Sequence, residues 1–163
     1  MTTGYITWTW NGKAVRVGFD RVGEASTVLL LPAFSSISTQ QKMRPLQERL
    51  ASEFATVAVD WPGFGTETRP SIAWEPAAYS TFLQHVLTHL APRLFATVAA
   101  GHAARYALSA AATVSGSLGS LCLVAPTWRG PLPTMIPADL GLAPGSPEQV
   151  IFRYWVLSST AST

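Results

Sequence analysis

The chain has 163 residues, 48% hydrophobic and only 12% charged, a balance typical of one globular domain with a real core. Its net charge of +2 comes from scattered arginines, so no nucleic-acid partner is predicted. The single cysteine, Cys122, excludes an internal disulfide and a cysteine zinc cluster, and its apolar neighbours predict that it lies in the core. With no secretory signal pattern and no apolar run of membrane length, the sequence predicts a cytoplasmic protein without a membrane partner.

The chain begins with the pattern of a β-hairpin. Large and polar residues alternate on both sides of Asn11-Gly12, and both of these residues tolerate the positive φ angles of a tight hairpin turn. Two antiparallel strands are therefore predicted, near residues 4–10 and 13–20.

Beyond the hairpin, short apolar runs alternate with stretches of helical spacing. Continuous apolar runs of this length are typical of strands buried on both faces. Such alternation predicts parallel βαβ units, so the fold class is α/β, with three layers and a mostly parallel sheet that the antiparallel hairpin extends at one edge. Strands are predicted at 27–31, 55–60, 94–99 and 120–125, and helices within 38–54, 77–90 and 102–114.

The character of the sequence changes after Thr127. A segment rich in proline and glycine follows, and Ser146-Pro147 then has the pattern of a helix start that leads into the apolar VIFRYWVL. We therefore predict a core over residues 1–128. Residues 129–163 are predicted to form a linker and an apolar helix that either begins a cap or covers the sheet.

Four segments, in order and with matching spacing, resemble the α/β-hydrolase superfamily from Gly4 to about Trp128. VLLLPAFSS is similar to the strand and loop of the oxyanion hole, and VAVDWPGFGTETRP to the segment written Asp-x-Pro-Gly-x-Gly. VAAGHAARYAL resembles the turn that carries the nucleophile, and LCLVAPTW the strand after it. A branch of cyanobacterial and plant hydrolase-like proteins with Gly-His-Ala at this turn is the closest resemblance. It implies a truncated hydrolase fold, with the strand near Leu121 at an edge of the sheet.

The resemblance places Ala103 at the nucleophile position, where alanine has no atom able to attack a substrate. The superfamily's catalytic acid and histidine would follow beyond the end of this chain. His102 lies inside the motif, where we expect a packed or hydrogen-bonded side chain, and it is a weak catalytic candidate. No cofactor is predicted.

The resemblance implies that the oxyanion hole is kept although the nucleophile is missing, because the donors of an oxyanion hole are backbone N–H groups. By resemblance these donors are the N–H groups of Phe34 and Ala104, and the following helix start adds its positive dipole end. The candidate ligand-binding side chains nearby are Ser35, Ser36, Thr127 and Trp128.

His85 and His89 are four residues apart on one helical face, a spacing compatible with metal binding. No glutamate or cysteine accompanies them in a metal-binding motif, and histidines on a helix surface are far commoner. The sequence therefore predicts no metal site.

Three functions remain open from the sequence. The first is a degenerate hydrolase-like protein without conventional catalysis, which binds a small apolar carbonyl compound or acid. The second is an active hydrolase of esters or related bonds that uses His102, Ser35 or Thr127. The third is an interaction module in which the exposed sheet edge pairs with a second copy or with another chain.

Overall fold

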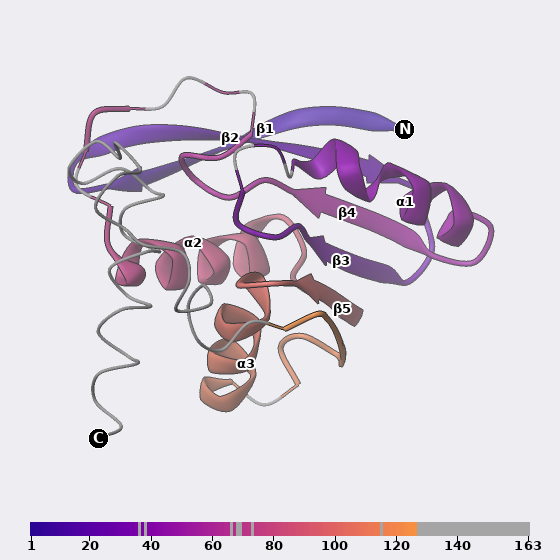
Figure 1. Ribbon diagram of the computed structural model, residues 1–163. Helices are drawn as coiled ribbons and strands as arrows, with labels where there is room; N and C mark the ends of the chain where they lie inside the picture. Colours follow the sequence, from indigo (N-terminus) through magenta and orange to yellow (C-terminus); the bar gives the residue numbers. More distant parts are fainter. Residues whose placement is uncertain are drawn as a thin grey trace, which may run out of the picture.

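The computed structural model describes residues 1–35, 37, 39–65, 67, 70–72, 74–114 and 116–126. These residues form a six-stranded sheet with the order β1-β2-β4-β3-β5-β6 (Figure 1). The strands are β1 Thr2–Trp10, β2 Lys13–Val22, β3 Thr27–Leu31, β4 Ala55–Val59, β5 Leu94–Ala100 and β6 Ser120–Val124. The helices are η1 Gln40–Met43, α1 Arg44–Leu50, α2 Pro76–His89 and α3 Ala103–Thr113.

The predicted hairpin and mixed sheet are confirmed. Asn11 and Gly12 join β1 to β2 with φ angles of 49° and 75°, the left-handed conformation that their short side chains permit. The hairpin continues the sheet through antiparallel pairing of β2 with β4. The pairs β3–β4, β3–β5 and β5–β6 are parallel, as alternating strands and helices predict.

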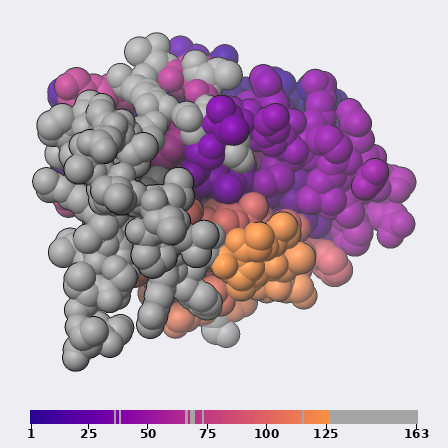
Figure 2. Space-filling model, in the orientation of Figure 1, coloured from indigo at the N-terminus to yellow at the C-terminus, as the bar shows by residue number. Residues whose placement is uncertain are grey.

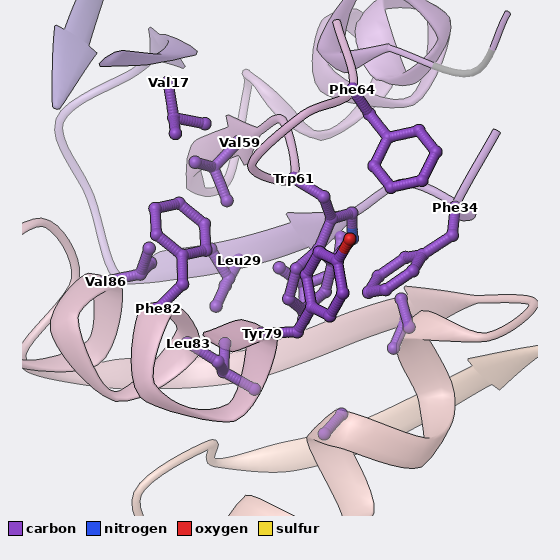
Figure 3. Close-up of a cluster of buried hydrophobic side chains, with 14 of the residues drawn as sticks. Val17, Leu29, Phe34, Val59, Trp61, Phe64, Tyr79, Phe82, Leu83 and Val86 are labelled. Carbon is purple, nitrogen blue, oxygen red and sulfur yellow. The ribbon is translucent and has the colours of Figure 1, made fainter. Parts of the chain in front are cut away.

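The two faces of the sheet carry cores of different size. The larger core includes residues of α2 and α3, and its fully buried side chains Trp61, Tyr79 and Phe82 are grouped in Figure 3. The smaller core, on the face of α1, consists of Val28, Leu30 and Ala58 with partly buried residues of α1 against them. The three layers are therefore present, with the thicker hydrophobic layer on the side of α2 and α3.

The fourth predicted strand differs from the expectation that it is buried. In β6 the residues alternate between exposed and half-buried, and Cys122 is exposed rather than part of the core. The reason is position, because β6 ends the sheet among the described residues and pairs only with β5 there. The turn and strand that precede Ala125 lie at the surface in orange (Figure 2).

The linker and apolar helix predicted over 129–163 lie outside the described residues. Within the part of the chain that the structure describes, no helix has the length and apolar character needed to cross a bilayer.

Candidate functional site

The turn between β5 and α3 is formed by Gly101 and His102. Gly101 has a φ angle of 53°, a left-handed conformation that is energetically unfavourable for any residue with a side chain. Ala103 is already the first residue of α3 and is fully buried. The left-handed position of the turn is therefore Gly101, two positions before the residue that the resemblance assigned to the nucleophile.

The imidazole of His102 is largely buried at this turn. Burial disfavours the charged imidazolium, so the pKa of His102 is lowered to about 4. At neutral pH the ring is therefore uncharged, with one nitrogen able to donate a hydrogen bond and the other able to accept one.

The loop after β3 faces this turn and is held at both ends by residues that follow β4. Trp61 Nε1 donates a hydrogen bond to the carbonyl oxygen of Pro32 at 2.9 Å. At the other end, the N–H of Gln40 donates to Asp60 Oδ1 at 2.6 Å. A Cβ atom added to Gly101 would lie 3.1 Å from the Cβ of Ala33, so loop and turn approach each other closely.

Aromatic rings fill the space beneath the loop. The ring of Phe34 lies 4.4 Å from that of Trp61 and 4.9 Å from that of Tyr79, measured between centroids (Figure 3). It also stacks on Tyr106 of α3 at 5.2 Å, and burial raises the pKa of this tyrosine to about 12. The Phe34 side chain thus joins the loop to both helices of the larger core.

Asp60 is a buried carboxyl group with a strongly shifted pKa. Desolvation raises the pKa of Asp60 to about 7, and the negative charges of Asp20 and Glu67 add to the rise. The hydrogen bond from the Gln40 N–H acts in the opposite direction. There is little room around the carboxylate, since a Cβ on Gly65 would collide with it.

The two predicted oxyanion donors, Phe34 and Ala104, lie on the two sides of the turn after β5. Phe34 lies in the loop that faces the turn, as expected. The N–H of Ala104 donates to the carbonyl oxygen of Gly101 at 3.3 Å, and its role as a donor to a ligand stays a prediction. This hydrogen bond forms because α3 begins at Ala103, so the N–H of Ala104 already closes the first helical turn.

Ser35 and His102 are the predicted side chains that can be placed. The Ser35 hydroxyl oxygen accepts a hydrogen bond from the Ile37 N–H at 3.3 Å, so it helps to shape the loop. Ser36, Thr127 and Trp128 lie outside the described residues. Sequence reasoning gave no role to Asp60 and Trp61, because their partners Gln40 and Pro32 lie in a loop that is distant in the sequence.

Comparison with known proteins agrees with the fold. The model of the alpha/beta hydrolase family matches residues 28–161, and the chain therefore belongs to this family. No curated protein matches the sequence closely enough to be counted as a relative.

Solved structures of the same fold are numerous, and three illustrate the range. Cfl2 from Burkholderia cenocepacia is 26% identical, with a TM-score of 0.62 over 96% of this chain and 50% of that one. A thermophilic esterase from Thermogutta terrifontis is 20% identical, with a TM-score of 0.66 over 82% of this chain and 49% of its own. A probable hydrolytic enzyme from Pseudomonas aeruginosa PAO1 is 18% identical, with a TM-score of 0.66 over 77% and 41%. The chain thus spans half or less of each of these proteins.

Proposed function

We propose that this chain is an α/β-hydrolase-fold protein that performs no nucleophilic catalysis and binds a small carbonyl compound or carboxylic acid at the turn after β5. One observation carries the proposal. The strained turn position is Gly101 and the position assigned by resemblance is Ala103, and neither side chain has an atom that can attack a substrate.

The proposed binding groups are backbone N–H groups on the two sides of the site. Phe34 supplies one from the loop after β3. The left-handed residue of the turn is Gly101. We therefore propose that the second donor is the backbone N–H of His102, which directly follows it, rather than that of Ala104. The positive dipole end of α3 favours an oxygen-bearing ligand over a cation.

Catalysis is tested with a fluorophosphonate probe and a panel of ester, epoxide and haloalkane substrates. We expect no covalent labelling and no turnover above the rate without protein. The competing proposal is an active hydrolase that uses His102, Ser35 or Thr127. Turnover that disappears in His102→Ala, with the fold intact, would support that competing function and overturn ours.

Binding is tested by tryptophan fluorescence during titration with butyrate, with butylamine as the matched cation. Gly101→Ala narrows the site, because its new Cβ meets Ala33, and we expect at least a tenfold loss of butyrate affinity. Gly12→Ala is the matched control: it also places a side chain at positive φ, but with open space around it. Equal butyrate affinity in the two variants would contradict the proposed site.

A second function, an interaction module, is favoured by one observation. β6 ends the described sheet, and its outer backbone groups are a ready template for another strand. This proposal and the predicted cytoplasmic location are tested by sedimentation and by fractionation of cells that express the chain.

A further inference from the structure

Two histidines lie on one face of the last turns of α2. His85 and His89 are separated by four residues, just over one helical turn, which brings their side chains side by side. Their rings are stacked, with centroids 4.3 Å apart and planes inclined by 29°. The two rings are therefore close enough for one nitrogen of each to bind the same ion.

The tautomer of His89 is fixed by the backbone of the same helix. His89 Nδ1 lies 3.0 Å from the carbonyl oxygen of His85, and a carbonyl can only accept a hydrogen bond. Nδ1 therefore carries the proton and Nε2 keeps its lone pair. Metal-binding histidines commonly have this arrangement, in which one ring nitrogen donates to a backbone carbonyl and the other is left for the ion.

His85 has a comparable environment on the side of β1. Its ring forms a hydrogen bond with the backbone of Thr7, while burial and the nearby His89 lower its pKa. One ring nitrogen of His85 is thus engaged by the backbone, and the other is available as a metal ligand.

An open groove borders His85. It has a volume of about 440 Å³ and is lined by His85 together with Thr81, Gln84, Thr88 and residues 7–9 of β1. Water in this groove can complete the coordination of an ion held by two imidazoles. The described residues contain no group of three or more His, Cys, Asp or Glu side chains suited to a metal, so the site rests on two protein nitrogens.

We propose that His85 and His89 form a two-histidine site for a divalent transition-metal ion, with Cu²⁺ bound most tightly, then Ni²⁺ and Zn²⁺. Imidazole nitrogens suit all three ions, and the order follows the general ranking of divalent ions at nitrogen sites. The site lies on α2 and is independent of the turn after β5.

The test measures Cu²⁺ affinity by calorimetry in the full chain without a histidine tag. Cys122→Ser is used as the parent because the exposed thiol of Cys122 also binds Cu²⁺. We expect His85→Ala and His89→Ala each to weaken Cu²⁺ binding at least tenfold. His89 is exposed and His85 is half-buried, so both variants should fold, and circular dichroism checks this.

The control is His102→Asn, which removes the third histidine of the chain and should leave Cu²⁺ affinity within twofold of the parent. Electron paramagnetic resonance of the Cu²⁺-loaded parent should show splitting from two imidazole nitrogens, and from one in either alanine variant. Unchanged Cu²⁺ affinity in His85→Ala or His89→Ala, or a signal without two imidazole nitrogens, would overturn the proposal.

Discussion

At the scale of single residues, the turn after β5 depends on what Gly101 lacks. Its left-handed φ angle and its approach to Ala33 leave almost no room for a side chain. Gly101 is thus the left-handed residue of the turn and also a residue without a side-chain atom that could attack a substrate. Restoring one atom there does not restore a reaction, because a nucleophile needs a base to take its proton.

We therefore predict that neither Gly101→Ser nor Ala103→Ser hydrolyses p-nitrophenyl acetate faster than the parent. Gly101→Ser should lose about 1–3 kcal/mol of stability through strain, and Ala103→Ser about 1–3 kcal/mol because its hydroxyl is buried. Ester turnover is followed by absorbance and stability by guanidinium unfolding. Turnover in either variant would reveal a base near the turn.

A second prediction concerns Asp60. Its pKa is about 7 when folded and 3.8 in the reference state, so the folded protein binds the extra proton between these values. Stability therefore falls as pH rises from about 4 to 7, by at most about 1.4 kcal/mol per pH unit, and is then constant. Asp60→Asn should remove this slope, measured by unfolding at several pH values.

His102 acts in the opposite sense, so the comparison must be made between variant and parent. Its folded pKa of about 4 lies below the reference value of 6.5, and stability is lost as pH falls between these values. The difference between parent and Asp60→Asn cancels this contribution. A difference that does not change with pH would show that Asp60 is not shifted as described.

The residue scale is also where the sequence predicted least. The motif Gly-His-Ala fits two alignments, with the strained residue at Gly101 or at Ala103, and composition cannot choose between them. The choice depends on where β5 ends and α3 begins, and such boundaries are the least certain part of a sequence-based prediction. The roles of Asp60 and Trp61 depend on contacts with a distant loop, which no local pattern encodes.

At the scale of elements, the sequence predicted much more. All six strands and the helices α1, α2 and α3 lie where apolar periodicity and turn residues placed them, with small shifts at their ends. The exceptions are β5 and β6, whose apolar runs indicated burial: Phe95 of β5 is 55% exposed, and the residues of β6 are exposed or half-buried. Burial of a strand depends on its neighbours in the sheet, and β6 has a neighbour on one side only among the described residues.

Phe34 joins the loop after β3 to α2 and α3, and we predict that Phe34→Ala lowers the free energy of unfolding by about 3–5 kcal/mol. Phe34 is only 8% exposed, and its ring contacts Trp61 after β4, Tyr79 of α2 and Tyr106 of α3. Phe95→Ala is the matched control, since Phe95 is 55% exposed and should cost less than about 1 kcal/mol. Similar losses in the two variants, measured by guanidinium unfolding, would contradict the packing role of Phe34.

At the scale of the whole molecule, the sheet formed by the described residues has β1 and β6 as its outer strands. We predict self-association through β6, seen as a sedimentation coefficient that rises with protein concentration in the presence of reductant. Cys122→Lys should suppress it, because a charge on an outer strand opposes strand pairing.

The matched control is Tyr5→Lys, a similar change at an exposed position of β1 on the opposite edge. This variant should associate like the parent. A monomer at every concentration, or equal effects of the two lysines, would exclude β6 as the interface.

The attachment of the loop after β3 has a consequence for conformational entropy. Both anchors, at Pro32 and at Gln40, come from the adjacent residues Trp61 and Asp60. The two ends of the segment between Pro32 and Gln40 are therefore held by neighbouring residues and cannot separate from each other. Loss of either hydrogen bond would release one end of this segment, which would then regain the conformations that loop closure removes. The side chains of Asp60 and Trp61, directly after β4, thus limit the conformations open to the loop that faces Gly101.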